Sequence, residues 1–263
     1  MKKILSLIMV LIFAFTLASC GEEKEKVYVQ DSEILNVLQS PDDYKGKYIV
    51  FNARISQILV NGDETTLQVY TPYDDFKDNA LVTIYNSSET YIEDEYITID
   101  GKINGSQKYE NMFGEKLKSP GIEAETIKKT TYMEAVRPAI KTIDVWQTID
   151  HGNAPMTLEK VEFAEKETRV YVTFENHRGE TYSLYTYSPV IVQNDTQFDL
   201  DYSNYEGDYP ELNSEVVDGV KTSGILTFPA IDQNSDFMFR ISGNTMSDWD
   251  EQTYDFYVPA NPQ

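Results

Sequence analysis

Cys20 is the residue best placed for covalent chemistry, because it is the only cysteine among 263 residues and cannot form a disulfide within its own chain. Lys2 and Lys3 precede an uncharged apolar run, ILSLIMVLIFAFTLAS, which ends in small residues immediately before this cysteine. That is the layout of a secretion signal. The run has about 16 residues, fewer than the roughly 20 a helix needs to cross a bilayer, and no comparable run follows. We therefore expect the mature chain not to be a transmembrane protein.

The order Leu17, Ala18, Ser19, Cys20 resembles the lipobox of bacterial lipoproteins. The resemblance implies that residues 1–19 are a lipoprotein signal peptide and that Cys20 becomes the lipidated N-terminus. Acyl chains such as palmitate contribute about 0.8 kcal/mol per buried methylene, so a pair of chains anchors stably where one binds reversibly. The expected location is the extracytoplasmic face of the bacterial cell membrane.

Other catalytic or metal-binding motifs are missing from the sequence. His151 and His177 lack a companion at metal-ligand spacing, and both fall in turn-like stretches where we expect them to be exposed. The nucleophile motif G-x-S-x-G is absent, since Ser223 and Ser242 have glycine on one side only. Glycine-rich phosphate loops are absent as well. We predict no catalytic residue, no cofactor-binding residue, no cofactor and no metal site.

Carboxylates are abundant, and with 44 acidic residues some pairs approach by chance, so a hydrolase pair cannot be recognised from spacing. The densest acidic stretch spans 194–211, and calcium could take oxygen ligands from it. Its aspartates are Asp195, Asp199, Asp201 and Asp208. The stretch does not fit an EF-hand loop, because the sixth position would be Asn204 and the twelfth Pro210. Calcium binding and an ordinary solvated loop both stay open.

Tyrosines are the second unusual feature, with 19 in the chain. Two clusters, YSLYTY over 182–187 and YSNYEGDY over 202–209, would suit an adaptable recognition surface. Tyrosine is also an ordinary strand residue with an outward hydroxyl, and the sequence favours that simpler interpretation.

The formal net charge of −22 excludes several partners. Residues 31–130 hold 18 acidic and 10 basic residues, and 131–263 hold 23 and 8. A polyanion would be repelled, so nucleic acid is not an expected partner, and adsorption to anionic lipid headgroups is disfavoured. The membrane contact we expect is the N-terminal lipid. Six lysines of the first module could still gather on one face: Lys102, Lys108, Lys116, Lys118, Lys128 and Lys129.

The elements that must carry these residues are mainly strands. After a tether over 20–30, the stretch 31–41 predicts a short helix that Pro41 ends. Five runs rich in β-branched and aromatic residues follow up to residue 130, with Asn61-Gly62 as the expected turn of the first hairpin. Alternation over 96–101 predicts one wet and one buried face. Everything after the first helix is expected to be strand.

The segments YKGKYIVFNARI, DEYITIDGKING and GIEAETIKK resemble the OB-fold modules of bacterial lipoproteins, including the tRNA-anti-like group. The resemblance covers 31–130 and implies a small β-barrel. It does not by itself imply nucleic-acid binding.

Beyond a linker placed at 131–142, seven or eight short strands separated by turn residues predict a β-sandwich over 143–263. MTLEKVEFAEKETRVYVTFENHRGE and VVDGVKTSGILTFPAIDQNSDFMFRI resemble immunoglobulin-like, telokin-like domains of unknown function in Gram-positive lipoproteins. In that family the ending T-x-E-N matches Thr173 to Asn176. The resemblance brings no catalytic residues.

The expected fold class is therefore all-β, a small OB-like barrel followed by an immunoglobulin-like sandwich. The expected function is that of a non-catalytic binding module anchored at the cell envelope, not an enzyme. Its partner is a protein, glycan or small solute of the envelope. The alternative is an envelope hydrolase that acts on glycans through an unrecognised carboxylate pair. Two converging acids, one of raised pKa, would favour the hydrolase, and exposed apolar patches would favour the binding module.

Overall fold

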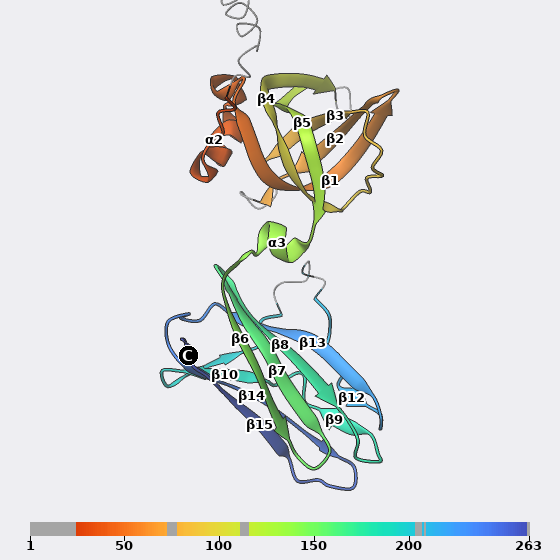
Figure 1. Cartoon of the computed structure of the whole chain (residues 1–263), viewed down its shortest axis with the longest axis vertical. Coiled ribbons are helices and arrows are strands. Elements are labelled where there is room, and N and C mark those ends of the chain that lie inside the picture. The colour runs from red at the N-terminus through yellow and green to blue at the C-terminus, as the bar shows by residue number, and fades with distance from the viewer. Residues whose placement is uncertain (1–24, 73–77, 111–115, 203–206, 208, 262–263) are drawn as a thin grey trace, which may run out of the picture.

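The protein is all-β and consists of a barrel followed by a two-sheet sandwich, as the computed structural model shows (Figure 1). The structure describes residues 25–72, 78–110, 116–202, 207 and 209–261. The predicted signal peptide and Cys20 lie outside these residues. Within the described part of the chain, no helix is both long and apolar enough to cross a membrane.

The chain enters the barrel through three short helical turns, where the sequence predicts one short helix, and Pro41 begins the third turn rather than ending the helical segment. The three turns are η1 (Asp31–Glu33), α2 (Ile34–Gln39) and η2 (Pro41–Tyr44). Ile34, Val37 and Leu38 of α2 are buried against the barrel core, because they recur at the spacing of one helix face. The preceding segment is also fixed to the barrel, since Tyr28 pairs with Tyr48 and Lys26 forms an ion pair with Glu125.

Five strands close the barrel in the order β1, β2, β3, β5, β4. Their bounds are β1 (Tyr48–Asn61), β2 (Glu64–Tyr70), β3 (Asn79–Tyr85), β4 (Tyr96–Glu110) and β5 (Lys116–Thr130). The contact between β3 and β5 is parallel and all the others are antiparallel. Ile97 and Ile99 are fully buried, while Thr98 between them is half-buried, which confirms the predicted alternation.

The first hairpin turns one residue later than the sequence suggests. Asn61 pairs with Glu64, so Gly62 and Asp63 are the two central residues. Only Gly62 has a positive φ, at 66°. A glycine at the first central position is the requirement of a type II′ turn, whereas an Asn61-Gly62 turn would need positive φ at both residues. The expectation for Asn61-Gly62 was therefore wrong in register.

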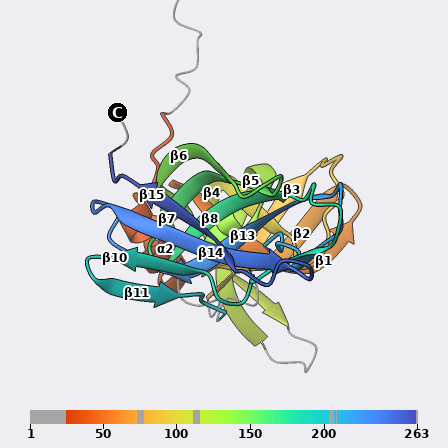
Figure 2. The ribbon, with the colours of Figure 1, turned by 90° about the horizontal axis from the view of Figure 1, so that it is seen from below.

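The ends of β4 and β5 extend beyond the barrel as a two-stranded arm, which we define as residues 106–110 and 116–120. These residues pair with each other from Ser106↔Pro120 to Glu110↔Lys116, whereas the pairings of β4 with β1 and of β5 with β3 end before them. Figure 2 shows this arm, in yellow-green, projecting past the outline of the rest of the protein.

A short helix, α3 (Tyr132–Val136), joins the two bodies, so the expectation of strands alone after the first helix was wrong here. Thr131 caps this helix by accepting a hydrogen bond from the Glu134 amide, and the Glu134 side chain accepts one from the Thr131 amide in return. This capping box was readable in the sequence as T-x-x-E. The predicted linker 131–142 thus contains α3 and the first residues of β6.

Two sheets form the sandwich, and Figure 2 shows β6, β7 and β8 on one side and β10, β11 and β14 on the other. The four-stranded sheet has the order β13, β8, β7, β6, with β6 (Ala139–Asp150), β7 (Pro155–Ala164), β8 (Glu167–Glu175) and β13 (Lys221–Pro229). The six-stranded sheet contains β9 (Tyr182–Leu184), β10 (Val190–Gln193), β11 (Thr196–Asp199), β12 (Glu215–Val216), β14 (Phe237–Thr245) and β15 (Gln252–Val258).

The core between the sheets comes from alternate residues of the facing strands. Val170, Val172 and Phe174 of β8 meet Phe239 and Phe256 of the opposite sheet, and all five side chains are buried. Inside the core, the ring centroids of Phe239 and Phe256 lie 6.0 Å apart. The sequence missed only short or broken strands, such as the two residues of β12 and the interruption between β9 and β10.

Candidate functional site

A pocket of about 540 Å³ opens where the sandwich edge is interrupted. Strands β9 and β10 lie one after the other along the same side of β14, since β9 pairs with its Gly243–Thr245 end and β10 with its Met238–Arg240 part. The intervening residues 185–189 leave the sheet as a loop. The Tyr185 amide still donates to the Ser242 carbonyl of β14 at 2.9 Å, and Pro189, just before β10, has no N–H with which to continue the ladder.

The opposite wall comes from residues 200–202 and 209–212, which lie along the edge of β13 that does not pair with β8. The Asp201 amide donates to the Thr227 carbonyl at 2.9 Å, and the Ile225 amide donates to the Pro210 carbonyl at 2.8 Å. Gly224 permits this approach, because a Cβ there would lie only 2.3 Å from the Leu212 backbone nitrogen. The wall therefore depends on backbone pairing rather than on side-chain packing alone.

Tyrosines from both of the clusters singled out in the sequence meet at this pocket. Tyr187 comes from 182–187, and Tyr202 and Tyr209 come from 202–209. The Tyr202 hydroxyl donates to the Tyr187 carbonyl at 3.2 Å and joins the two walls. Tyr187 and Tyr202 are 70% and 59% exposed, so their rings are accessible to a ligand. The simpler interpretation, ordinary strand tyrosines, does not fit these loop positions.

The remaining lining is apolar at its base and acidic in its charge. The other residues of the described lining are Thr186, Leu200, Asp201, Glu211, Leu212, Ile225, Leu226 and Thr227. Leu212 and Leu226 are buried against the sandwich core. Asp201 and Glu211 are the charged groups, and the described lining contains no lysine, arginine or histidine. The pocket is thus suited to a ligand with an apolar or cationic group and unsuited to an anion.

Behind Tyr209, on the outer face of the four-stranded sheet, lies a buried charge cluster. Arg169 of β8 is 1% exposed and donates to two carboxylates, to Glu162 from Nε at 3.0 Å and to Glu167 from Nη1 at 2.8 Å. The Tyr209 hydroxyl donates to Glu167 at 2.6 Å, and Tyr171 donates to Glu162 at 2.7 Å. One guanidinium therefore satisfies two acids, and the pocket wall is attached to the same cluster.

The titration of the cluster reflects this pairing. Burial alone would raise the pKa of the Glu162 carboxyl, but hydrogen bonds from Lys160, Tyr171 and Arg169 outweigh burial and hold that pKa below its ordinary value of 4.5. Burial and the hydrogen bond to Glu167 raise the pKa of Tyr209, so its hydroxyl stays protonated and acts as a donor. Glu162 is therefore ionised at physiological pH, and Tyr171 and Tyr209, whose pKa values are raised, are neutral.

The same cluster contacts the junction with the barrel. Arg169 Nη1 donates to the Arg137 carbonyl at 2.8 Å, just after α3. Tyr209 lies edge-on to Tyr132 of α3, with 6.3 Å between ring centroids, and Tyr132 lies edge-on to Tyr96 of the barrel at 5.6 Å. Pocket, charge cluster and barrel are thus connected by direct contacts.

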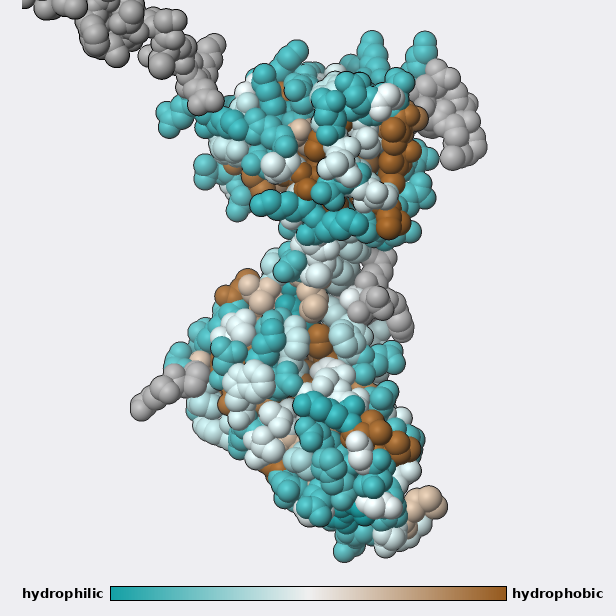
Figure 3. Space-filling model, turned by 45° about the vertical axis from the view of Figure 1, so that its right-hand side comes forward, coloured by the Kyte–Doolittle hydropathy of each residue, from teal (hydrophilic) through white to brown (hydrophobic). Residues whose placement is uncertain are grey.

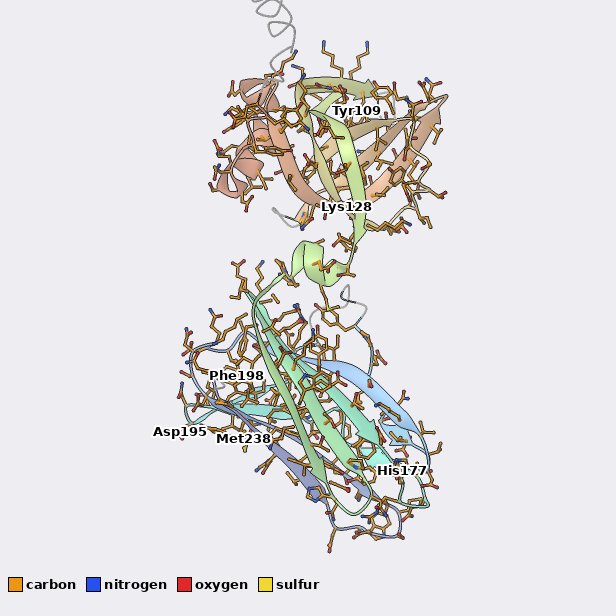
Figure 4. The ribbon with its side chains drawn as sticks, viewed as in Figure 1. Tyr109, Lys128, His177, Asp195, Phe198 and Met238 are labelled. Carbon is orange, nitrogen blue, oxygen red and sulfur yellow. The ribbon has the colours of Figure 1, made fainter. Side chains whose placement is uncertain are left out.

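The described aspartates of the acidic stretch 194–211 lie apart from one another. Asn194 and Asp195 have φ values of 49° and 62° and form the two-residue turn between β10 and β11, at the sandwich edge in Figure 4. Asp199 accepts a hydrogen bond from Gln197, Asp201 lines the pocket, and Asp208 lies outside the described residues. No three acidic, histidine or cysteine side chains in the described ranges form a metal-binding group. No calcium site is assembled from them.

The two histidines behave differently from each other. His177 is exposed, as expected, and lies 3.4 Å from the Glu175 carboxylate. His151 is half-buried rather than exposed, because its Nε2 is hydrogen-bonded to the Thr253 carbonyl at 2.9 Å and its ring packs edge-on to Tyr254. The expectation of an exposed His151 was wrong, since tertiary packing recruits this loop residue as a link to β15.

The six lysines of the barrel do not line one groove. Figure 4 places Tyr109, which lies in the arm beside Lys108, and Lys128 at opposite ends of the barrel. Lys129 forms an ion pair with Glu95 at 2.7 Å, and Lys102 is paired in register with Glu123. Only Lys108, Lys116 and Lys118 share a location, the arm. The face seen in Figure 3 is mainly hydrophilic, with hydrophobic residues exposed along one side of the barrel.

Exposed apolar side chains occur at the far end of the sandwich. The β14–β15 loop carries Met246 and Trp249, which are 74% and 78% exposed. Arg178 fixes this loop, because its guanidinium donates to Asp248 at 3.1 Å and to the His151 carbonyl at 2.9 Å. Single exposed apolar residues are normal on a protein surface, so this loop is weaker than the pocket as a candidate.

Comparison with known proteins adds no functional assignment. No protein family and no curated protein matches the chain. Among solved structures, a functionally unknown protein from Listeria monocytogenes EGD-e is similar at 8% identity, over 48% of this chain and 88% of that one, with a TM-score of 0.39. The yjhA protein from Bacillus subtilis is similar at 17% identity, over 44% and 98%, with a TM-score of 0.35. A conserved domain protein from Bacillus anthracis is similar at 7% identity, over 80% and 91%, with a TM-score of 0.37. Likenesses at this level carry no argument.

The charge cluster predicts a large effect of Arg169→Met on stability. Removal of the guanidinium leaves buried carboxylates without their partner, and the expected loss is about 3–5 kcal/mol. Lys160→Met is the matched control, because Lys160 also pairs with Glu162 but is partly exposed, and its loss should be at most about 1 kcal/mol. Both tryptophans lie in the sandwich, so urea unfolding followed by tryptophan fluorescence reports on this body. Equal losses in the two variants would contradict the assigned role of Arg169.

The lowered pKa of Glu162 predicts the direction of acid sensitivity. Because the folded-state pKa lies below 4.5, ionised Glu162 contributes its full stability above that pH and loses it as the pH falls through the folded-state pKa. Glu162→Gln cannot lose this contribution, so its stability should fall less between neutral pH and about pH 3 than that of the unmodified protein. Urea midpoints measured across that range provide the comparison. Identical pH dependences in the two proteins would refute the assignment.

Proposed function

We propose that the chain is a lipid-anchored, non-catalytic binding protein of a bacterial cell envelope, and that the tyrosine pocket receives a cationic ammonium group of its ligand. The observation that carries the proposal is the composition of the pocket, three tyrosines and two carboxylates without a basic side chain in the described lining. The lipobox resemblance of Leu17 to Cys20 supports the anchor.

Aromatic rings favour ammonium groups for an electrostatic reason. The face of a tyrosine ring is negative, and a cation above it gains about 0.5–2 kcal/mol, more when water is excluded. Tyr187 and Tyr202 offer such faces at the rim, and Asp201 and Glu211 add negative charge to the same pocket. The net charge of −22 acts in the same direction, because it raises the local concentration of cations.

The two resemblances noted in the sequence fit a binding role. The barrel order β1, β2, β3, β5, β4 with β3 and β5 parallel supports an OB-like module, and the two-sheet sandwich supports an immunoglobulin-like, telokin-like module. Neither fold specifies an activity. The absence of nucleic acid among its partners stays a prediction. The acidic surroundings of the barrel face at Tyr85 support it, since the Glu64 carboxylate raises the pKa of that phenol.

The carboxylate pair held by Arg169 does not support the alternative, a glycan hydrolase. Such an enzyme needs two facing acids, one of them with a raised pKa. Glu162 and Glu167 do face one another across a guanidinium, but Arg169 pairs with both and the pKa of Glu162 is lowered. This carboxylate pair has the properties of a structural ion cluster.

Calorimetry with defined probes tests the pocket. Spermidine and a trilysine peptide carry ammonium groups from two sources, a small solute and a polypeptide, and should bind the protein. Citrate should not bind, and a neutral chitin trisaccharide should bind more weakly than either cation. Tyr187→Ala and Tyr202→Ala should each weaken binding of the cations by about three- to thirtyfold, and Glu211→Gln should weaken it in the same direction.

Tyr257→Ala is the matched control, because Tyr257 is 60% exposed but lies on β15, outside the pocket lining. Its affinity for the cations should equal that of the unmodified protein. Preferential binding of the trisaccharide, or equal losses in Tyr187→Ala and Tyr257→Ala, would overturn the proposed ligand class.

The anchor predicts that Cys20→Ala abolishes firm membrane attachment. In the host cell the unmodified protein should stay in the membrane fraction after a high-salt wash, because acyl chains are held by hydrophobic burial that salt does not weaken. The Cys20→Ala protein should be released by the same wash. Mass spectrometry of the N-terminal peptide should find the acyl modification on Cys20. Salt-resistant attachment of Cys20→Ala would show that the lipid is not the anchor.

A further inference from the structure

The arm of β4 and β5 gathers three lysines on one face of a two-stranded ribbon. Lys108 lies directly opposite Lys118, and Lys116 is two residues from Lys118, so all three share a face. All three side chains are exposed. Lys45 lies near the base of the arm, because a Cβ on Gly105 would come within 3.5 Å of its side chain. The arm is therefore a local concentration of positive charge on a strongly acidic protein.

Acidic groups near these lysines reduce the charge without cancelling it. Asp42 accepts hydrogen bonds from the Ser106 amide at 2.7 Å and from its hydroxyl at 2.8 Å. These bonds, followed by the charges of Lys118 and Lys45, hold the pKa of Asp42 below its usual value. Glu110 is the other acid in the described arm, opposite Lys116 in register. Glu115 also precedes Lys116 in the sequence, so four lysines stand against three acids and the region keeps a formal charge of +1.

The Lys108–Lys118 pair violates a rule of sheet construction. Like charges directly opposite each other in an antiparallel pair are unfavourable. This repulsion matters more in an arm that has no further strand paired beside it, because an isolated two-stranded hairpin is only marginally stable in water. Sequences break such local rules mainly where function requires it. A partner with negative charge would convert this repulsion into attraction.

The arm lies at the end of the barrel from which the chain leaves toward Cys20. Figure 1 places the first described residues at the end remote from the sandwich, and Figure 4 shows Tyr109 of the arm at that same end, with nitrogen-tipped side chains projecting away from the sandwich. Cys20 precedes the first described residue, Glu25, by a segment that spans at most roughly 18 Å when extended. A lipid on Cys20 would therefore keep this end close to the membrane surface.

We propose that the lysine face of the arm docks onto the anionic headgroups of the membrane that holds the protein and thereby orients the barrel with the sandwich pointing outward. The inference rests on the lipid anchor of the proposed function. The proposal revises the expectation that the acidity of the chain disfavours contact with anionic headgroups. At physiological salt, charges are screened over about 8 Å, so acidic groups farther away than this have little effect on the potential at the arm. A weak contact suffices, since the anchor supplies a high effective concentration of lipid.

Vesicle binding by the unlipidated chain, residues 21–263, separates this contact from the anchor. Phosphatidylcholine vesicles with phosphatidylglycerol should bind the chain at low salt, and binding should disappear at high salt and with phosphatidylcholine alone. Replacement of Lys108, Lys116 and Lys118 by Gln should reduce the affinity on the order of a hundredfold, roughly fivefold per lysine. The matched control replaces Lys128, Lys166 and Lys221 by Gln, which changes the net charge equally at other places, and it should bind like the unmodified chain.

Hydrogen exchange keeps the test independent of the variants. Anionic vesicles should slow exchange of the amides in 106–110 and 116–120 and leave those of β13 unchanged. Equal loss of binding in the two triple variants, or protection outside the arm alone, would overturn the docking. If the lipid were not the anchor, the unmodified protein would be released from membranes by the high-salt wash described above, which is a different result from loss of vesicle binding.

Discussion

The buried guanidinium of Arg169 is the interaction on which the arrangement of the protein depends. It joins two carboxylates of the sandwich sheet, the carbonyl of Arg137 at the junction and, through Glu167, the hydroxyl of Tyr209 in the pocket wall. Charges removed from water are costly unless every donor and acceptor finds a partner. That condition fixes the side chains, the chain after α3 and the segment along β13 in one geometry.

A consequence is that the pocket and the junction are not independent. Tyr209 contacts Glu167 with its hydroxyl and Tyr132 with its ring, so a ligand that displaced Tyr209 would disturb both the charge cluster and the contact with the barrel. The hydrogen bonds described above do not connect Tyr187 or Tyr202 to the junction. Ligand contact through these two exposed rings leaves the cluster intact, whereas contact through Tyr209 would transmit the event to α3.

The strand pattern of the barrel and the sandwich was predictable, because alternating β-branched and aromatic residues report directly on burial. The helix α3 was predictable from its capping box and was missed, since its five residues are too few for periodicity. The pocket could be foreseen only as two tyrosine clusters. Their meeting depends on the gap between β9 and β10 and on the close approach at Gly224, and both are tertiary facts that a local pattern does not contain.

The distribution of charge explains how one acidic chain can serve two opposite electrostatic tasks. In water with physiological salt, charges act over about a Debye length of 8 Å, so a surface is sensed as separate patches rather than as its sum. The pocket, near the junction, carries Asp201 and Glu211 without a cation in its described lining, while the arm places Lys108 beside Lys118 at the end of the barrel remote from the sandwich. The barrel stands between the two patches, so anionic lipid at one end does not compete with the carboxylates for a cationic ligand at the other. Net charge therefore excludes neither of the two proposed contacts, because the electrostatic potential within one screening length decides each of them.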